Sequence, residues 1–400
     1  MGFRFIDRVM FVLFLVSFFI SGLYAQRDVL TLSDGSLFVG KEFYPEFSWE
    51  TTPMYYMFGD TKRVLLNEEV AFIAERTDFL CIEKSHGFNE FGAAELGAGH
   101  EVAAFKSIKP TVKVLFYFNS AYAWPFTSYN KYFRHKEINK HPELKKLLIK
   151  DPQTGEPLQR KGAYLFDVLN PETREWWVNT VVKGVKESGS DGAFIDQMHG
   201  FYFLRPEKSD EIRIAMGKMM IDLKKELGPD KILLGNNAAQ ELAQYAYPAC
   251  DAVMFEHYNP ETISKEKLLE DWQHMQRIAK DGKMSIFRIG VEVEKHLLPN
   301  EKSHKNDYAE EMAQFSKERL EYYLACFLIG AQPYSYFQYG WGWRLDTGSL
   351  IDYPALQKPL GAPKGAYTRV SQEKWIFTRE FEHASVWVDT DKGIGKIIWK

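Results

Sequence analysis

The stretch Leu165-Phe-Asp-Val-Leu-Asn-Pro-Glu-Thr-Arg-Glu-Trp-Trp177 predicts the end of a strand followed by the start of a helix. Pro171 suits the first helical turn, where its missing N–H breaks no intrahelical hydrogen bond, and Glu172 suits the positive end of the helix. The turn at 188–192 ends this helix, and a short apolar strand then stops at Asp196. The unit therefore delivers a carboxylate at the carboxyl end of a strand, which is where α/β barrels carry their chemistry.

The composition is that of an ordinary globular protein with many aromatic residues. The chain has 400 residues, a length that suits a barrel with extensions. A net charge of −4 gives no indication of a nucleic-acid partner. Aromatic residues make up 15% of the chain. Two interpretations of this enrichment stay open: a large aromatic core, or ring platforms on which the apolar faces of sugars stack.

Residues 1–25 have the pattern of a secretory signal peptide. Charged residues at 4, 7 and 8 precede the apolar run 9–20, and small residues follow before position 25. The run is short for a membrane span, so we expect a secreted or periplasmic protein without an integral membrane span after signal removal; an uncleaved anchor is the alternative. The three cysteines lack the spacing of a disulfide framework or a zinc site and are expected to be buried: Cys81, Cys250 and Cys326.

From residue 79 onward, strand and helix patterns alternate, which predicts a parallel sheet. We expect a (β/α)8 TIM barrel over residues 79–345, a leader at 26–78 that packs on it, and a short β-rich extension at 346–400. An open doubly wound sheet is the alternative, but residues 86–92 do not form the glycine-rich phosphate loop that it would need. The expected barrel strands are 79–83, 113–119, 163–169, 193–196, 232–237, 252–256, 284–289 and 333–337.

Acidic, amide and aromatic side chains gather at the predicted carboxyl ends of these strands. Metal-ligand spacing is poor and no HExxH motif occurs, so neither a metal nor an organic cofactor is expected. The rim suits the binding of a sugar, because amides both donate and accept hydrogen bonds. The predicted substrate-binding residues are Glu83, Asn119, Trp124, Asp167, Asn236, Asn237, Tyr258, Arg288, Trp341 and Trp343.

Two carboxylates on different strands of one barrel mouth are what the cleavage of a glycosidic bond requires. We predict Asp196 as the nucleophile or base. Glu256 follows an apolar strand, and apolar surroundings raise the pKa of a carboxyl group, so we predict it as the general acid. Glu83 and Asp167 stay open as alternative acids. Simpler structural roles also stay open: Asp167 as a loop brace, Glu83 with Arg288 as an ion pair, and the two asparagines as turn formers.

The segments Phe-Asp-Val-Leu-Asn-Pro-Glu-Thr-Arg-Glu-Trp-Trp177 and Gly189-Ser-Asp-Gly-Ala-Phe-Ile-Asp196 resemble a strand–helix–strand segment of barrel glycosidases of the α-galactosidase and α-glucosidase type. The chain is most similar to the uncharacterised group called hypothetical glycosyl hydrolase 15. The resemblance implies that Asp196, on the fourth strand, is the nucleophile and that a carboxylate on the sixth strand, Glu256, is the acid/base. The sixth-strand residue is usually Asp in those families, and Glu256 departs from that pattern.

We therefore expect a secreted glycoside hydrolase that cleaves a poly- or oligosaccharide, with a preference for a retaining outcome and a carbohydrate as its partner. The alternative is a catalytically inactive barrel that binds glycan as part of a surface capture system. A third class, a metal-dependent deacetylase or hydrolase, would need a convergent His/Asp cluster, and the strand ends provide none.

Overall fold

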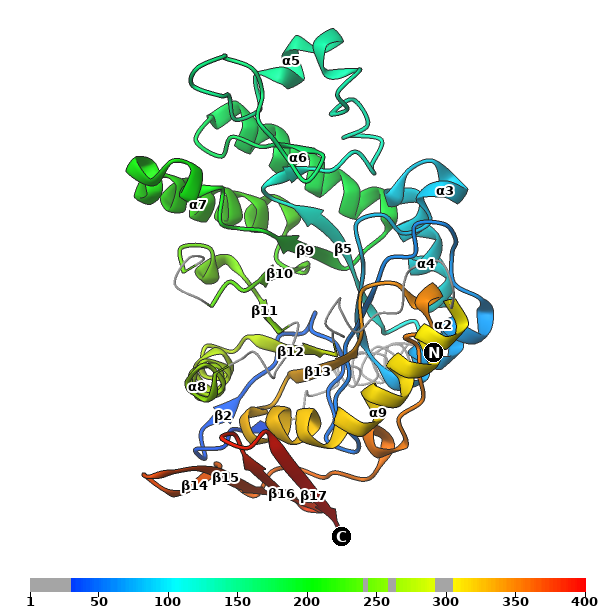
Figure 1. Cartoon of the computed structure of the whole chain (residues 1–400), viewed down its shortest axis with the longest axis vertical. Helices are drawn as coiled ribbons and strands as arrows, with labels where there is room; N and C mark the ends of the chain where they lie inside the picture. Colours follow the sequence, from blue (N-terminus) through cyan, green and yellow to red (C-terminus); the bar gives the residue numbers. More distant parts are fainter. Residues whose placement is uncertain (1–29, 240–243, 258–263, 292–304) are drawn as a thin grey trace, which may run out of the picture.

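The computed structural model describes residues 30–239, 244–257, 264–291 and 305–400 (Figure 1). Eight parallel strands form one sheet, hydrogen-bonded in chain order. A parallel bridge between Met54 and Phe337 joins the first strand to the last, and the Tyr55 N–H donates to the Phe337 carbonyl at 2.8 Å. This closes the predicted TIM barrel. Its strands are β3 (Tyr56–Phe58), β4 (Phe79–Ile82), β5 (Lys113–Asn119), β9 (Gly192–Asp196), β10 (Ile232–Asn236), β11 (Ala252–His257), β12 (Met284–Gly290) and β13 (Ser335–Gly340).

One of the barrel strands assigned from the sequence is wrong, and one barrel strand was missed. The segment 163–169 is not a barrel strand: β8 (Ala163–Leu165) pairs antiparallel with β6 (Tyr122–Ala123) and β7 (Gln159–Arg160) in a separate small sheet. It has no place in the barrel because β5 pairs directly with β9. The missing strand is β3, which lies in the segment assigned to the leader and is too short for a clear periodic signal. The two errors offset each other, so β9 is still the fourth barrel strand and β11 the sixth.

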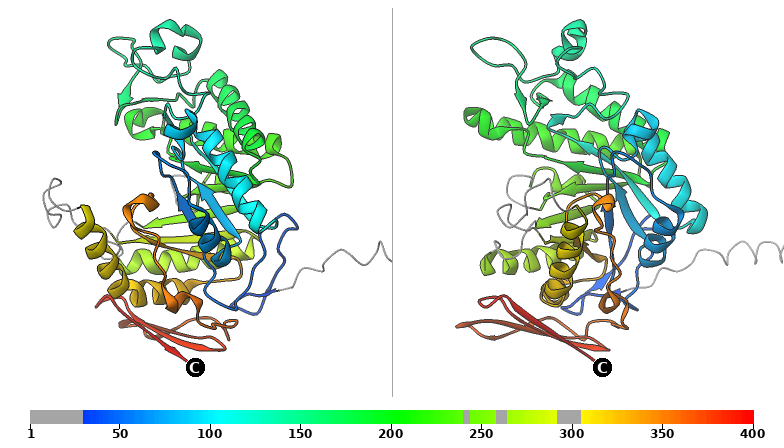
Figure 2. Two further views of the ribbon diagram at one scale, coloured as in Figure 1. Left: turned by 90° about the vertical axis from the view of Figure 1, so that its right-hand side faces the viewer. Right: turned by 45° about the vertical axis from the view of Figure 1, so that its right-hand side comes forward.

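Helices surround the barrel strands (Figures 1 and 2). Within the described part of the chain the longer ones are α2 (Asn67–Arg76), α4 (Ala94–Ile108), α6 (Pro171–Ser188), α7 (Ser209–Leu227), α8 (Lys265–Lys280) and α9 (Lys305–Gly330), and two single turns are α3 (Phe88–Phe91) and α5 (Pro142–Lys145). The connection from β6 to β7, which carries α5, extends away from the barrel at the top of Figure 1.

The helix α6 forms as the motif predicts. The Asn170 side chain caps it by accepting the Glu172 N–H at 3.0 Å, and Gly189 ends it in a left-handed conformation. Trp177 is fully buried, and its indole N–H donates to the backbone carbonyl of Asn119 at 2.9 Å. The motif thus fixes the end of the neighbouring barrel strand β5.

Glycine at the start of β9 allows close pairing of two central strands. A Cβ atom on Gly192 would lie 1.9 Å from the carbonyl oxygen of Ile232. Asp191 in turn fixes the entry to the strand, because its carboxylate accepts the Val114 N–H and pairs with Lys106, both at 2.9 Å. The Asp-Gly pair therefore sets the register that brings Asp196 to the barrel mouth.

Residues 30–47, with the short strands β1 (Leu30–Thr31) and β2 (Leu37–Phe38), pack across the amino-terminal end of the barrel. Phe38 and Phe47 both stack on Tyr334, with ring centroids 4.8 and 4.9 Å apart. Lys41 pairs with the buried Asp251, just before β11, at 2.7 Å. This segment covers the end of the barrel opposite the predicted active site.

The predicted β-rich extension is a four-stranded antiparallel sheet, β14 (Thr368–Ser371), β15 (Lys374–Glu380), β16 (Ala384–Asp389) and β17 (Ile394–Trp399). It lies beside α9 (Figures 1 and 2). The buried Arg379 guanidinium joins the two units by donating to the carbonyls of Leu328, Ile329 and Ala331 near the end of α9. This contact satisfies carbonyls that a helix end leaves without intrahelical donors.

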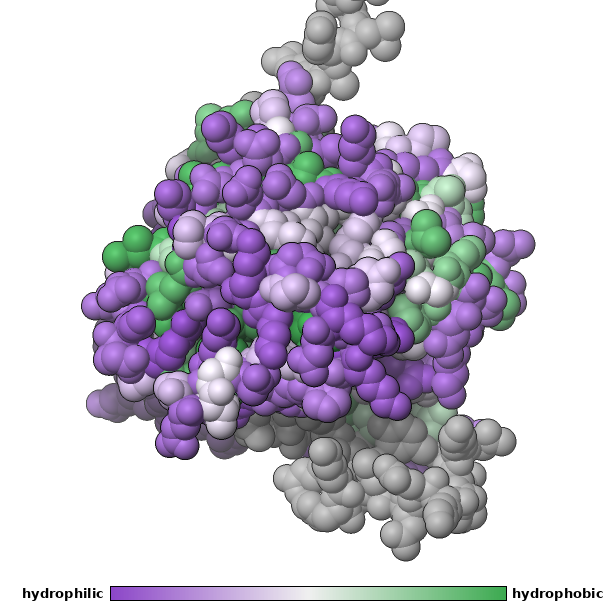
Figure 3. Space-filling view, turned by 90° about the horizontal axis from the view of Figure 1, so that it is seen from above, coloured by the Kyte–Doolittle hydropathy of each residue, from purple (hydrophilic) through white to green (hydrophobic). Residues whose placement is uncertain are grey.

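The three cysteines are buried free thiols, as predicted: Cys81, Cys250 and Cys326. The predicted signal peptide, residues 1–25, lies outside the described residues. Among the residues that are described, no helix combines the length and apolar character needed to cross a bilayer. Seen from above, the surface is mostly hydrophilic, with scattered hydrophobic side chains (Figure 3).

Candidate active site

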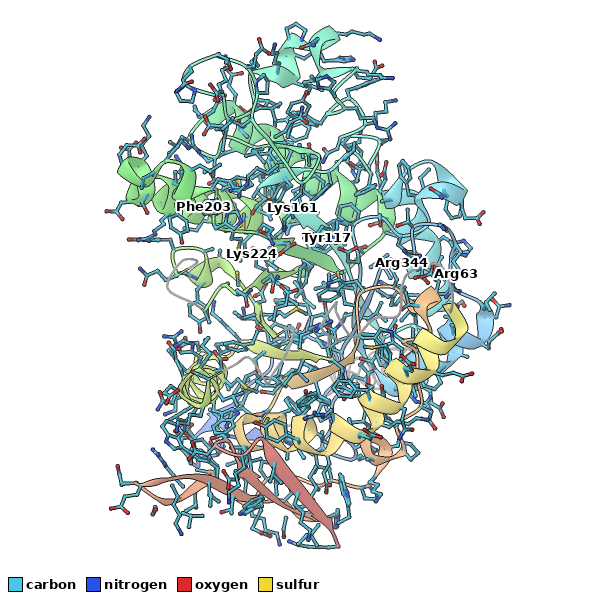
Figure 4. All side chains as sticks on the ribbon, in the orientation of Figure 1. Arg63, Tyr117, Lys161, Phe203, Lys224 and Arg344 are labelled. Atoms are coloured by element: carbon cyan, nitrogen blue, oxygen red, sulfur yellow. The ribbon has the colours of Figure 1, made fainter. Side chains whose placement is uncertain are left out.

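A pocket of about 170 Å³ opens at the carboxyl ends of the barrel strands. Barrel strand ends and the loops that follow them supply most of its wall, and the β7–β8 hairpin adds Lys161. Figure 4 labels two of the lining residues, Tyr117 on β5 and Lys161 on the hairpin. The lining residues are Met57, Glu83, Lys84, Tyr117, Asn119, Tyr122, Trp124, Lys161, Phe194, Asp196, Gln197, Asn236, Glu256 and Trp343.

Asp196, the last residue of β9, accepts hydrogen bonds on both carboxylate oxygens. Its Oδ2 accepts from the Tyr117 hydroxyl at 2.6 Å and from the Asn119 amide at 3.3 Å. Its Oδ1 accepts from the Gln197 backbone N–H at 2.8 Å and from the Asn236 amide at 2.9 Å. These four donors come from three adjacent regions of the barrel mouth, so the carboxylate has a defined orientation toward the pocket.

Asn236, at the end of β10, links Asp196 to Glu256 on β11. Its Nδ2 lies 2.9 Å from Asp196 Oδ1 and 2.6 Å from Glu256 Oε2. An amide nitrogen carries two hydrogens, and here it directs one to each carboxylate. The next residue, Asn237, accepts the Glu256 backbone N–H on its side-chain oxygen at 3.1 Å. The two asparagines therefore hold the predicted carboxylate pair together.

Glu83 brings a third carboxylate to the pocket. It is buried directly after β4 and forms an ion pair with Lys84. Burial raises the pKa of the Glu83 carboxyl, the ammonium of Lys84 opposes this, and the negative charges of Asp196 and Glu256 raise the pKa further. Lys84 also lies over the ring of Tyr117, with its Nζ 5.2 Å from the centroid. The structure thus identifies Glu83 as a carboxyl group that retains its proton to a higher pH than an ordinary Glu.

Two tryptophans lie on different parts of the pocket wall. Trp124 follows the short strand β6 and stacks on Tyr122, with ring centroids 5.2 Å apart. Trp343 follows β13, and its backbone carbonyl accepts the Gly59 N–H at 2.7 Å, which anchors its loop to the end of β3. The Arg288 guanidinium lies over the Trp343 ring at 4.5 Å from the centroid. Both indoles are partly exposed and line the pocket, which gives it two aromatic surfaces.

The loop that carries Trp343 is fixed further by a network of charges. The Asp346 N–H donates to the fully buried Asp60 at 3.1 Å, and Asp60 pairs with Arg63 at 2.9 Å. Arg344 pairs with Asp346, and Figure 4 labels the two arginines of this network. The last barrel strand is thereby connected to the first at the pocket side of the barrel.

The other predicted site residues lie elsewhere. Asp167 does not line the pocket; it pairs with Arg205 at 2.7 Å and accepts the Leu169 N–H at 3.2 Å, because its strand lies outside the barrel. Asp167 therefore braces its loop, which is the structural role given as an alternative in the sequence analysis. Arg288 and Trp341 line a smaller adjoining cavity of about 30 Å³, and Trp341 is buried. Tyr258 lies outside the described residues.

Several pocket residues were not predicted from the sequence. Tyr117 had a usable signal, because it precedes Asn119 by two positions on a strand and therefore points to the same face. Gln197 follows Asp196 directly. Lys84 likewise follows Glu83 directly. Tyr122 and Lys161 gave no such signal, since the small sheet outside the barrel positions them. Across the described residues, no group of three His, Cys, Asp or Glu side chains has the arrangement to hold a metal ion.

Comparison with known proteins gave one family and a set of distant structures. The glycoside hydrolase domain of PelA from Pseudomonas aeruginosa is 13% identical, covering 67% of this chain and 91% of that one, with a TM-score of 0.40. The α-amylase from Geobacillus thermoleovorans, complexed with acarbose, is 12% identical over 86% and 87% of the two chains, with a TM-score of 0.49. No curated protein sequence matches the chain significantly. The family described as hypothetical glycosyl hydrolase family 15 matches residues 106–385, and the chain belongs to this family.

Proposed function

We propose that this protein is a retaining glycoside hydrolase in which Asp196 is the nucleophile and Glu256 the general acid/base. The observation that carries the proposal is the shared amide of Asn236. Since its nitrogen contacts one oxygen of each carboxylate, those two oxygens lie no more than about 5.5 Å apart. This upper limit matches the separation of roughly 5 to 5.5 Å between the carboxyl groups of retaining enzymes. Inverting enzymes need a larger gap that admits a water molecule.

The chemistry follows from the two positions. Glu256 protonates the leaving glycosidic oxygen while Asp196 Oδ2 or Oδ1 attacks the anomeric carbon, which forms a covalent glycosyl ester. Glu256, now a carboxylate, takes a proton from water as the water attacks the same carbon and releases Asp196. Tyr117 and Asn119 orient the nucleophile through their bonds to Oδ2. Trp124 and Trp343 supply the faces on which sugar rings stack.

Glu83 is the competing candidate for the acid, because its pKa is raised. We favour Glu256 because it shares Asn236 with Asp196, whereas Glu83 already has a counter-ion in Lys84. In this arrangement the Glu83–Lys84 pair binds sugar hydroxyls beside the reacting centre. The resemblance to barrels of the α-galactosidase and α-glucosidase type leads to the same pair of catalytic residues.

The test is a glycan and aryl-glycoside panel applied to the wild type, Asp196→Asn, Glu256→Gln and Glu83→Gln, reading reducing ends and binding together. We expect the Asp196 variant to lose cleavage of every substrate by at least about a thousandfold while binding persists. The acid variant should retain most of its kcat/KM on substrates with good leaving groups, because their departure needs no protonation. Its kcat should still fall, because the base that activates water in the second step is lost. If Glu83→Gln shows that pattern instead, Glu83 is the acid.

A product analysis by NMR separates the two stereochemical outcomes, since a retaining enzyme first releases the anomer present in the substrate. Release of the opposite anomer would overturn the retaining mechanism. Binding without cleavage by all four proteins would replace the enzyme with a glycan-capture barrel.

We further propose that the protein is secreted, on the basis of the charged, apolar and small-residue pattern of residues 1–25. Expression of the full chain with fractionation, followed by N-terminal sequencing of the exported product, tests this. A full-length product that stays with the membrane would instead indicate an uncleaved anchor.

A further inference from the structure

Gln197 occupies an unusual backbone position beside the proposed nucleophile. Its φ is 60°, in the left-handed region that residues other than glycine seldom adopt. Such strain persists where the surrounding structure enforces it and is concentrated at functional sites. Here the Gln197 N–H donates to Asp196 Oδ1 at 2.8 Å, and the side chain lines the pocket. The strained conformation therefore places both a backbone and a side-chain amide at the site.

His199 fixes which end of the Gln197 amide faces the pocket. The Phe201 N–H donates to His199 Nδ1 at 3.0 Å, so Nδ1 is an acceptor without a proton. In a neutral imidazole the other nitrogen then carries the hydrogen. That nitrogen, Nε2, lies 2.7 Å from Gln197 Oε1, and the contact is a donation from His199 to the amide oxygen. Exchanging the oxygen and nitrogen of the amide would place two donors against each other, so the chemistry admits one orientation.

The surroundings of His199 maintain this neutral tautomer. Burial lowers the pKa of His199 to about 4; the negative charge of Asp196 opposes this and the nearby Arg160 and Lys161 add to it. The rings of Phe201 and Phe203 pack on the imidazole, with centroids 4.8 and 5.3 Å away. The ring is thus held in place by aromatic packing as well as by hydrogen bonds.

The consequence is a positioned hydrogen-bond donor with no partner among the residues that the structure describes. With Oε1 occupied by His199, Gln197 presents its Nε2 group, which makes no hydrogen bond to any described residue. We infer that Gln197 Nε2 donates to an oxygen substituent on the sugar carbon next to the anomeric carbon, and that His199 is the positioning residue for this donor. This inference rests on the proposed function. A hydrogen bond to that hydroxyl strengthens in the transition state, so Gln197 contributes to rate as well as to the choice of sugar.

The direct test compares Gln197→Met, which keeps the length of the side chain without a donor, with the wild type on the aryl glycoside that the wild type cleaves best and on its 2-deoxy analogue. We expect Gln197→Met to lower kcat/KM about 10- to 100-fold on the parent glycoside. On the 2-deoxy analogue, wild type and variant should be equally slow, because the acceptor is absent. An equal loss on both substrates would mean a structural role and would overturn the inference.

Two substitutions of His199 separate its two nitrogens. His199→Asn keeps an acceptor for the Phe201 N–H but has no group at the Nε2 position, and should match Gln197→Met. His199→Gln places an amide nitrogen near the Nε2 position and should retain most of the wild-type selectivity for the 2-hydroxyl. If His199→Asn kept the selectivity for the 2-hydroxyl and His199→Gln lost it, the positioning role of His199 would be overturned.

The tautomer of His199 can be measured on the wild-type protein alone, without a substrate and without any substitution. NMR after selective ¹⁵N labelling of histidine reports which imidazole nitrogen carries the proton, and we expect Nε2–H for His199. An Nδ1–H tautomer would overturn the role of His199 as the positioning residue for Gln197. Failure of the proposed function and failure of the Gln197 inference give different results. A wild type that neither cleaves nor binds any panel glycan overturns both proposals, whereas a wild type that cleaves the 2-deoxy analogue as fast as the parent overturns only the Gln197 donor.

Discussion

Two strand-to-helix junctions of this protein each carry an aspartate after a run of apolar residues, and the two aspartates have different roles. The junction between β8 and α6 contains Asp167, and the one between β9 and α7 contains Asp196. Asp167 is neutralised by the Arg205 guanidinium. Asp196 instead accepts hydrogen bonds from the uncharged groups of Tyr117, Asn119 and Asn236 and faces the pocket.

The difference comes from the sheet to which each strand belongs. β9 is a barrel strand, so its carboxyl end meets the ends of the neighbouring barrel strands, whereas β8 lies in a three-stranded antiparallel sheet to one side. A carboxylate at a strand end is therefore a candidate for barrel chemistry only if its strand is in the barrel.

The strongest test of this comparison is the same substitution at both junctions. Asp196→Asn should lower the rate of glycan cleavage by about a thousandfold or more, because the proposed nucleophile is lost. Asp167→Asn should leave the rate within about threefold and lower the free energy of unfolding by about 1–3 kcal/mol, because a partly buried hydrogen bond to a charged group is weakened. Kinetics on the panel substrate and chemical denaturation measure the two effects. A large loss of rate in Asp167→Asn would remove the distinction.

A second test breaks the connection between the junctions. Trp177→Phe keeps the ring packing of α6 but leaves the buried carbonyl of Asn119 without its donor. We expect the free energy of unfolding to fall by about 1–3 kcal/mol, with a lower rate of cleavage because Asn119 contacts Asp196. The matched control is Trp176→Phe on the same helix, which is partly exposed. Equal effects of the two substitutions on the rate would contradict the bracing role of Trp177.

The β9 junction should respond to pH through His199. Burial lowers its pKa from 6.5 to about 4, so between these values the unfolded chain binds a proton that the folded protein excludes. Stability should therefore decrease as the pH falls from about 6.5 to about 4, by about 1–3 kcal/mol for this one group. The measurement is the difference in the free energy of unfolding between wild type and His199→Gln across this range. A difference that does not change with pH would contradict the prediction.

The smallest effect should come from an exposed ion pair at the β8 junction. Lys146 and Glu172 pair at the start of α6, and both side chains are more than half exposed. Lys146→Gln should change the free energy of unfolding by less than about 0.5 kcal/mol, because water and salt screen such pairs. Denaturation at low and high salt measures it. A change as large as that in Asp167→Asn would mean that burial does not decide which charges at this junction matter.

The features of this fold that were predictable from the sequence are those whose signal lies in neighbouring residues. The cap at Asn170, the end of α6 and the strand that stops at Asp196 all follow from neighbouring residues, and the structure confirms them. The barrel strands rich in apolar residues were found for the same reason. The strand β3 was missed because three residues carry no detectable period, and 163–169 was assigned to the barrel because a local pattern does not state which sheet a strand joins.

The residues of the candidate site likewise divide into those with a local sequence signal and those that depend on tertiary contacts. Strand-end carboxylates and amides, among them Asp196, Asn236 and Glu256, were predictable because parallel strands align their carboxyl ends. Lys161 and Tyr122 were not, since the excursion between β5 and β9 folds back onto the barrel mouth and brings them to the pocket. The raised pKa of Glu83 was not predictable either, because it depends on burial and on two carboxylates from other strands.

The sequence by itself determined the barrel class, the capped helix α6, the β-rich extension and the carboxylates at the strand ends, because these depend on local propensity and on the alternation of strands and helices. Only the tertiary structure decided that Asn236 joins Asp196 to Glu256, that Asp167 is a brace, and that His199 orients Gln197. Each of these depends on distances between residues far apart in the chain or on the conformation of a loop, and a distance in space follows from the closure of the barrel.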